Sequence, residues 1–171
     1  MEILNNLNKL HQFWHKRVLF VCSGNICRSA AADGMLRQQL SDLGLSDKIY
    51  VDSVGTHGFH QGEAPDPRTI AVAEEDGINI KFLRARKITA KDFEKFDIIY
   101  AMDHGHYEEL HQLKPSDATC EIEMYLETGD VPDPWYGEKE DFYIMYDIIK
   151  ERMPHIIKSI SAGLEETPAE G

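Results

Sequence analysis

The sequence predicts an α/β protein whose core is a doubly wound, Rossmann-like sheet of four parallel strands with helices on both faces. Three observations support this prediction. Short apolar runs alternate along the chain with segments whose apolar residues recur at helical spacing, an order typical of βαβ units. The first run, residues 18–21, is apolar at every position, as expected of a strand buried on both faces. Gly44, Gly77 and Pro115 mark breaks between the predicted elements.

The first strand, residues 18–21, is followed by a predicted helix that begins just after Arg28. The apolar residues of this helix recur at helical spacing: Ala31, Ala32, Met35, Leu36, Leu40 and Leu43. A second strand is expected over residues 49–54, and a loop rich in glycine and histidine, residues 55–62, follows it.

The next helix has clear start and stop signals. Asp66 precedes Pro67, which suits the first position of a helix, and Gly77 is a typical end. A third strand is then expected over residues 97–101 and a helix over 103–113. Residues 118–122 form a weaker candidate for the fourth strand.

The last predicted helix is long, residues 138–162. The apolar side chains on its predicted buried face are Phe142, Met145, Tyr146, Ile149, Met153, Ile156, Ile157 and Ile160. Pro154 lies inside this helix and is expected to bend or interrupt it, because proline removes one hydrogen bond of the helix.

The chain of 171 residues suits a single domain with a substantial core. We expect this domain over residues 17–163, after an amphipathic extension at 1–16 and before a frayed acidic tail at 164–171. The extension is predicted to pack back onto the domain. A dimer contact, or a groove on a partner protein, is the alternative role for residues 1–16.

The composition narrows the classes of function and location. A formal net charge of −12 argues against a nucleic-acid partner. No apolar run approaches the roughly 20 residues of a membrane span, so no integral membrane association is expected. The N-terminus lacks the features of a secretory signal. Three cysteines do not form a closed disulfide set, which predicts a reducing, cytoplasmic location.

Residues 22–29 connect the first strand to the first helix and carry the strongest chemical signal. Cys22 ends the strand, and five residues separate it from Arg28. Gly24 and Asn25 are residue types that tolerate left-handed dihedrals. Such a turn aims successive backbone N–H groups of residues 23–27 into one concavity, with the helix N-terminus behind it. The sequence therefore predicts an anion-binding loop.

A cysteine in this loop is well placed to act as a nucleophile. Thiols facing N–H groups, a helix N-terminus and an arginine ionise more readily than free cysteine. The guanidinium of Arg28 offers a planar fork that matches two oxygens of a phosphate. Cys22 is then predicted to take part in covalent phosphoryl transfer through a phosphocysteine. The alternative is a small buried side chain without a chemical role.

A second constellation lies in residues 131–137, between the fourth strand and the last helix. A phosphocysteine mechanism needs a proton for the leaving oxygen, and Asp133 could supply it from a loop over the pocket. The alternative for an Asp-Pro pair is a turn or a helix cap. Trp135 and Tyr136 would form aromatic walls and make the pocket deep, which suits phosphotyrosine better than the shorter phosphoserine.

Together these segments resemble the low-molecular-weight protein tyrosine phosphatases. The resemblance rests on Val-Cys-x-Gly-Asn-Ile-Cys-Arg-Ser at residues 21–29 and on the Asp-Pro-aromatic-aromatic loop at 133–136. It extends over almost all of residues 17–160. Further segments similar to the family lie at residues 52–56, 65–68, 84–86 and 101–103.

The resemblance implies roles for individual residues. Cys22 would be the nucleophile, Arg28 the phosphate clamp and Asp133 the general acid and base. Phosphate would bind to the loop residues, which are Ser23, Gly24, Asn25, Ile26, Cys27 and Ser29. Asn25 and Ser53 would hold the strained backbone of the loop by hydrogen bonds, and the hydroxyl of Ser29 would stabilise the Cys22 thiolate.

The resemblance also concerns the rim and the redox chemistry of the pocket. Phe59 would be the wall opposite Trp135 and Tyr136, and His60 a hydrogen bonder that fixes its loop. Cys27 would form a reversible disulfide with Cys22 under oxidation. No metal or organic cofactor is implied, and the expected partner is a phosphotyrosine-containing protein or a small aryl phosphate.

The chain departs from the family pattern at three places. Ala30 replaces the proline that usually follows the loop serine, His106 stands where the family has asparagine, and residues 1–16 extend beyond the usual start. None of these changes affects the predicted nucleophile, clamp or acid.

Three rival functions remain to be distinguished. Protein-arginine phosphatases of the same fold tend to have threonine at the position of Ile26 and lack the paired aromatics. Thioredoxin-coupled arsenate reductases use a pair of downstream cysteines, whereas here only Cys120 lies downstream. A non-catalytic phosphotyrosine-binding module would be expected to lack Cys22 or Asp133.

Overall fold

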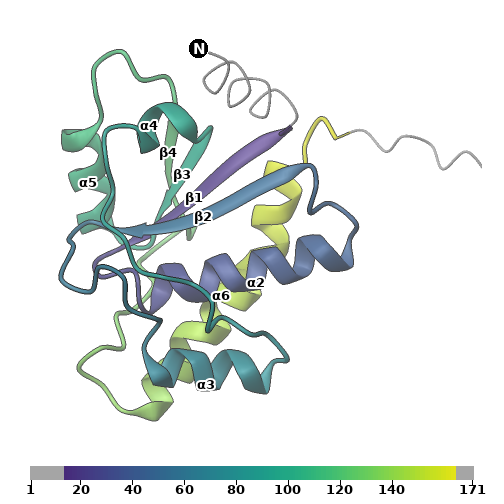
Figure 1. Cartoon of the computed structure of the whole chain (residues 1–171), viewed down its shortest axis with the longest axis vertical. Coiled ribbons are helices and arrows are strands. Elements are labelled where there is room, and N and C mark those ends of the chain that lie inside the picture. The colour runs from purple at the N-terminus through teal and green to yellow at the C-terminus, as the bar shows by residue number, and fades with distance from the viewer. Residues whose placement is uncertain (1–13, 165–171) are drawn as a thin grey trace, which may run out of the picture.

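The structure is a computed structural model that describes residues 14–164. Its centre is a four-stranded sheet in the order β2-β1-β3-β4. The strands are β1 (Lys16–Cys22), β2 (Ile49–Gly55), β3 (Ile98–Ala101) and β4 (Glu121–Met124), and every pairing is parallel. This confirms the predicted fold class, and Figure 1 shows the sheet between two layers of helices.

Helices cover both faces of the sheet (Figure 1). On one face lie α2 (Arg28–Asp42), α3 (Pro67–Glu75) and α6 (Lys139–Ile160), whose buried apolar side chains form the larger core cluster. On the other face lie the short α4 (Asp92–Lys95) and α5 (His104–Leu113), which contribute to a second, smaller cluster.

The first strand shows why residues 18–21 are apolar at every position. Val18 and Phe20 belong to the cluster shared with α2 and α6, whereas Leu19 and Val21 belong to the cluster shared with α4 and α5. All four side chains are fully buried. Because successive residues of a strand face opposite sides of the sheet, a central strand between two helical layers needs apolar residues throughout.

Most predicted boundaries are confirmed within one to three residues. Asp66 caps α3, where its carboxylate accepts a hydrogen bond from the Arg68 N–H at 2.8 Å, and Pro67 occupies the first turn. Gly77 adopts a φ of 76° just beyond that helix. The fourth strand lies at Glu121–Met124, which is later than predicted, and the short α4 was not predicted at all.

Of the two expected effects of Pro154, an interruption of the last helix is wrong. Helix α6 continues through it from Lys139 to Ile160. Pro154 and Lys150, whose carbonyl loses its partner, both lie on the exposed side of the helix, where water can satisfy the carbonyl. Met153 and Ile156 on the opposite side are buried in the larger core, and this burial holds the helix together.

The predicted extension and tail fall mostly on residues 1–13 and 165–171, which lie outside the described residues. The described end of the extension contacts the domain. The Trp14 ring lies 5.4 Å from the Tyr50 ring, and the His15 N–H donates to the Lys48 carbonyl at 2.8 Å. Within residues 14–164, none of the helices has the length and apolar character needed to cross a bilayer.

The topology places one end of β1 at a special position. After β1 the chain crosses to β2 on one side, and it later returns to β3 on the other side of β1. Cys22 pairs with Gly55 at the carboxyl end of β1, and Val21 pairs with Ala101. The end of β1 is therefore the switch point at which ligands bind in open α/β sheets.

Candidate active site

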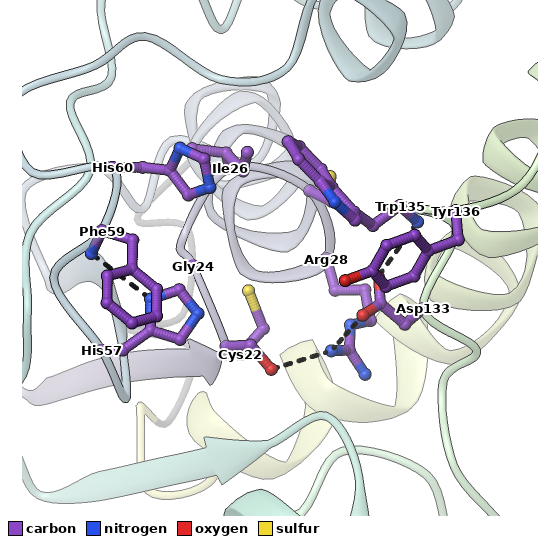
Figure 2. A pocket seen from close by; sticks show the side chains of 12 residues that line it. Cys22, Gly24, Ile26, Arg28, His57, Phe59, His60, Asp133, Trp135 and Tyr136 are labelled. Atoms are coloured by element: carbon purple, nitrogen blue, oxygen red, sulfur yellow. Dashed lines mark hydrogen bonds and ion pairs between the residues drawn. The ribbon is translucent and has the colours of Figure 1, made fainter.

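A cavity of about 360 Å³ opens at this switch point. Cys22, Arg28 and Asp133 all line it, although they come from β1, the start of α2 and the segment before α6. The predicted loop residues Ser23, Gly24, Ile26 and Cys27 also line it, as do the predicted walls Phe59, Trp135 and Tyr136. Figure 2 shows the Cys22 sulfur between Phe59 on one side and Asp133 with Tyr136 on the other.

The loop after Cys22 is held by backbone hydrogen bonds to two neighbouring segments. The Thr56 N–H donates to the Cys22 carbonyl at 2.9 Å, and the His57 N–H donates to the Ser23 carbonyl at 3.2 Å. Further along, the Asp66 N–H donates to the Ile26 carbonyl at 2.9 Å. These bonds occupy three carbonyl groups of the loop, an arrangement that suits a loop presenting its N–H groups to an anion.

Asn25 is the left-handed residue of the loop, with a φ of 61°, and this prediction is confirmed. Its side chain stabilises that conformation from both ends. The amide nitrogen donates to Ser29 Oγ at 2.9 Å, and the amide oxygen accepts from the Arg86 N–H at 3.1 Å. Asn25 is itself buried and does not line the cavity, so it shapes the loop from behind.

Gly24 is needed for close approach and not for a left-handed conformation, which corrects the prediction. It is absent from the glycines with positive φ. A Cβ at this position would lie 2.9 Å from Cδ2 of His60 and 3.3 Å from Cε1 of His57. Gly55 has a related role, since its Cβ would lie only 2.6 Å from the Ser23 carbonyl oxygen. The loop therefore packs directly against residues 55–60.

Cys22 is 2% exposed and contacts the hydroxyl of Ser29. Its Sγ lies 3.0 Å from Ser29 Oγ. Because Asn25 already donates to that oxygen, the hydroxyl proton of Ser29 is available to the sulfur or to the Val54 carbonyl at 3.4 Å. The predicted contact between Ser29 and Cys22 is present. Cys27 is the N-cap residue of α2, and within the described part of the chain its side chain makes no capping hydrogen bond.

Ser53 was predicted to hold the loop backbone, but its hydroxyl makes a different contact. It donates to Asp33 Oδ2 at 2.7 Å, within the layer between β2 and α2. Asp33 is fully buried and also forms an ion pair with Arg37. Burial raises the pKa of this carboxyl despite those partners. Ser53 therefore supports the packing of α2 and touches neither the cavity nor the loop backbone.

Arg28 is 3% exposed, and its guanidinium connects three segments. Nη1 donates to Asp103 Oδ2 at 2.8 Å and to the Val131 carbonyl at 3.2 Å. Nη2 lies 3.5 Å from Ser23 Oγ and 3.6 Å from Asp133 Oδ2 (Figure 2). Burial opposes the charge, but the negative groups around Arg28 outweigh it and raise its pKa. The guanidinium stays charged beside the loop.

Asp133 is more exposed than Arg28, with 45% of its side chain accessible. Its Oδ1 accepts a hydrogen bond from the Trp135 N–H at 3.1 Å, so the aspartate is held in a local turn. Its Oδ2 faces Arg28 across the cavity mouth. Such a carboxyl group reaches both the cavity and solvent, as a group that exchanges protons must.

Arg68 fixes the segment that carries Asp133, and this role was not predicted from the sequence. Its guanidinium donates to the Trp135 carbonyl at 3.3 Å and to the Gly137 carbonyl at 3.4 Å. It also pairs with Asp66 at 2.9 Å and lies 4.3 Å over the Phe142 ring. The segment before α6 is thereby tied to α3.

The rim of the cavity is aromatic on both sides. Phe59 is 85% exposed and packs on His57, with ring centroids 4.5 Å apart. Tyr136 is 95% exposed on the opposite side, and the Trp135 ring lies 5.3 Å from the His60 ring. His60 Nδ1 forms a hydrogen bond with Glu63 at 2.7 Å, in keeping with the predicted bonding role. His57 and His60 line the cavity in addition to the predicted walls.

Asp103 is a further site residue that the sequence prediction did not include. It follows β3, the strand beside β1, so its carboxylate lies at the same edge of the sheet as Cys22. Burial tends to raise its pKa, but the hydrogen bond from the His106 N–H and the charge of Arg28 lower it. This position after a central strand was the signal available in the sequence.

Cys27 lines the cavity as a neutral thiol. Burial and the charge of Cys22 raise its pKa to about 12. Cys22, and not Cys27, is therefore the candidate nucleophile of the loop. Among residues 14–164, no group of three or more His, Cys, Asp or Glu side chains is arranged to hold a metal ion.

Comparisons with known proteins identify the family. Residues 17–166 match the family model described as low molecular weight phosphotyrosine protein phosphatase. The phosphatase of that name from Schizosaccharomyces pombe is 36% identical over 152 residues, which cover 85% of this chain and 97% of the relative. The human protein of that name is 36% identical over 138 residues, with 77% and 87% covered.

Solved structures agree. The crystal structure of a protein tyrosine phosphatase from Entamoeba histolytica superposes with a TM-score of 0.81 at 32% identity, covering 87% of this chain and 99% of that one. Cys22, Arg28 and Asp133 all lie within residues 17–166, which match the family model. The chain therefore belongs to the low molecular weight phosphotyrosine protein phosphatase family.

Proposed function

We propose that this enzyme hydrolyses phosphotyrosine in two steps, with Cys22 as nucleophile, Arg28 as phosphate clamp and Asp133 as general acid and then general base. One observation carries this proposal. These three side chains, from distant parts of the sequence, line one cavity at the switch point of the sheet. The family to which the chain belongs supports the same assignment.

In the first step, the Cys22 thiolate attacks the phosphorus atom of the substrate, and an S–P bond forms. The bond between phosphorus and the tyrosine oxygen breaks, and Asp133 donates its proton to that oxygen, so that neutral tyrosine leaves. The N–H groups of the loop and the fork of Arg28 stabilise the charge on the three phosphoryl oxygens.

In the second step, a water molecule attacks the phosphocysteine. Asp133, now a carboxylate, accepts the proton of this water. The S–P bond breaks, inorganic phosphate is released and the Cys22 thiolate is restored. Ser29, whose Oγ lies 3.0 Å from Cys22 Sγ, donates a hydrogen bond to this leaving sulfur.

The aromatic rim supports an aryl substrate. Phe59 and Tyr136 stand on opposite sides of the mouth, with Trp135 beside Tyr136 (Figure 2). Aromatic faces on both sides favour a flat ring between them, and a phosphate at the loop is reached only by a side chain of sufficient length. We therefore propose a phosphotyrosine-containing protein, or a small aryl phosphate, as the substrate.

The chemistry of the cysteines supports two finer proposals. Cys22 and Cys27 line the same cavity as free thiols, and we propose that they form a reversible disulfide on oxidation. The third cysteine, Cys120, is also free and buried. Three free cysteines suit a reducing compartment, and we propose a cytoplasmic location.

The decisive experiment compares hydrolysis of a phosphotyrosine peptide with that of phosphoserine and phosphoarginine substrates, in the presence of a metal chelator. Turnover of phosphotyrosine alone is expected. The Cys22→Ser variant should lose turnover and still bind inorganic phosphate, because the loop and Arg28 remain. A preference for phosphoarginine would overturn the substrate assignment. Phosphate binding without any turnover by the unmodified enzyme would instead indicate a binding module.

A further inference from the structure

His106 is buried directly behind the phosphate loop without lining the cavity. It lies in the first turn of α5, and only 4% of its surface is exposed. Its Nε2 lies 2.8 Å from Ser23 Oγ, so the imidazole contacts the residue that follows the nucleophile. Its backbone N–H donates to Asp103 Oδ1 at 2.8 Å.

Both neighbours of His106 also contact the guanidinium of Arg28. Asp103 Oδ2 accepts from Arg28 Nη1 at 2.8 Å, and Ser23 Oγ lies 3.5 Å from Arg28 Nη2. The imidazole and the guanidinium are thus joined by two bridges, one through a carboxylate and one through a hydroxyl. Ser23 extends from the loop, Arg28 from α2, and Asp103 with His106 from the start of α5.

The imidazole is neutral at ordinary pH. Burial and the positive charge of Arg28 lower its pKa to about 4. A neutral imidazole carries one N–H and one acceptor nitrogen. The direction of its hydrogen bond with Ser23 therefore depends on which of the two nitrogens holds the proton.

The surroundings of Nδ1 decide the tautomer. Nδ1 lies 3.2 Å from Asp103 Oδ1 and has no partner with good hydrogen-bond geometry among the described residues. A carboxylate presents only lone pairs. An unprotonated Nδ1 would therefore repel the Asp103 carboxylate, whereas a protonated Nδ1 would attract it. With the proton on Nδ1, the nitrogen Nε2 becomes an acceptor. The Ser23 hydroxyl must then donate to His106.

We propose that His106 is a positioning residue for the phosphate clamp, because it accepts the hydroxyl proton of Ser23 and so turns the lone pairs of Ser23 Oγ toward Arg28. With its proton directed to Nε2, that oxygen presents its lone pairs to the guanidinium. Asp103 holds Nη1 from the other side. The fork of Arg28 is thereby fixed before substrate binds, which lowers the cost of ordering it in the complex. This inference rests on the role proposed above for Arg28.

Three variants separate this role from simple packing. His106→Phe keeps the ring volume and removes the acceptor, and Ser23→Ala removes the donor. His106→Gln places an amide oxygen near the former position of Nε2 and should restore the bond. The readout is the inhibition constant of inorganic phosphate, measured beside kcat and KM for a phosphotyrosine peptide.

His106→Phe is expected to weaken phosphate binding by about tenfold, the usual effect of one lost hydrogen bond to a loop that orients a charged group. KM should rise in parallel, with a smaller change in kcat. Ser23→Ala should give the same loss, and the double variant no more than either single change, because both remove one bond. His106→Gln should recover most of the affinity. Phosphate affinity unchanged in His106→Phe, or losses that add in the double variant, would overturn the proposal.

A measurement on the unmodified enzyme tests the tautomer directly. The nitrogen chemical shifts of the His106 side chain, observed by NMR at pH 7, should show the proton on Nδ1. A proton on Nε2 would contradict the proposed direction of the bond. This measurement, like phosphate binding, needs no turnover, so an inactive enzyme would count against the proposed function and leave this test intact. If His106→Phe does not fold, Ser23→Ala and the NMR result decide the question.

Discussion

Nη1 of Arg28 lies 2.8 Å from Oδ2 of Asp103, which links the first turn of α2 to the N-cap residue of α5, just beyond β3. Arg28 is 3% exposed, whereas 24% of the Asp103 side chain is accessible. In this ion pair, a buried guanidinium is held by a carboxylate that is partly exposed to water. It aims the guanidinium across the end of the sheet toward the cavity that contains Cys22.

Asp103→Asn should reduce kcat/KM by about 10- to 100-fold, because charge-assisted hydrogen bonds contribute about 1.5–3 kcal/mol. The loss should appear in KM and in phosphate affinity, since the change releases the clamp and leaves Cys22 and Asp133 in place. Steady-state kinetics with a phosphotyrosine peptide checks this. Asp117→Asn, at an exposed site beyond α5, is the matched control. Equal kinetics in the two variants would show that the pair is dispensable.

Asp133→Ala should slow a substrate with a poor leaving group by about 10²- to 10⁴-fold, the usual range for general acid catalysis. An activated aryl phosphate needs less protonation and should be affected much less. The ratio of the two rates is the measurement. Glu127→Ala, on the exposed segment before the Asp133 loop, serves as the control. Equal losses on both substrates would argue against a role as acid.

The same assay tests the contacts of Arg68. Arg68→Met removes the hydrogen bonds to the Trp135 and Gly137 carbonyls and should slow the poor leaving group by about tenfold, with phosphate affinity retained. In an Asp133→Ala background, Arg68→Met should cause little further loss, because its effect acts through that aspartate. A full additional loss would place the action of Arg68 elsewhere.

The stability of the fold should depend on pH through His106. Its pKa falls from 6.5 to about 4 in the folded state, so between these values the unfolded chain binds more protons than the folded chain. Stability must then rise with pH across this window, and it is lost as pH falls from 6.5 toward 4. Arg28, Asp103, Asp130 and Asp133 are the charged groups that act on this imidazole.

His106→Gln removes the titrating group. The free energy of unfolding, measured with urea at pH 7 and pH 4.5, should fall less in this variant than in the unmodified enzyme. The difference should approach about 2 kcal/mol, from roughly 1.4 kcal/mol for each unit of pKa. The comparison of the two proteins cancels most of the titration of distant carboxylates. An identical pH dependence in both would mean that His106 keeps its ordinary pKa.

Recovery from oxidation should depend on Cys27. The charge of Cys22 helps to raise the pKa of the Cys27 thiol, and oxidation of Cys22 to a sulfenic acid removes that charge, which favours attack by Cys27. Peroxide followed by a thiol reductant should restore activity in the unmodified enzyme. Cys27→Ser should recover less, whereas Cys120→Ser, outside the cavity, should behave like the unmodified enzyme. Equal recovery in all three would exclude the disulfide.

Much of this molecule follows from local features of its sequence. The apolar run at 18–21 requires burial on both faces, and Asp66 with Pro67 specifies the start of α3. Residues 22–29 carry the proposed nucleophile, the proposed clamp and the left-handed Asn25. Local propensity and spacing suffice to predict these features, because each is marked by a pattern of residues close in the chain.

The tertiary structure decided the rest. The Ser53 hydroxyl donates its hydrogen bond to Asp33 and not to the loop. Glycine is needed at position 24 because a Cβ there would collide with His60, and not because of its own dihedral angles. Helix α6 continues through Pro154 because the burial of Met153 and Ile156 outweighs one lost hydrogen bond. The contact of Arg28 with Asp103 and that of Ser23 with His106 become visible only when β3 lies beside β1. Contacts between segments so far apart leave no periodicity in the sequence, since they depend on strand order and on the space that neighbouring side chains leave.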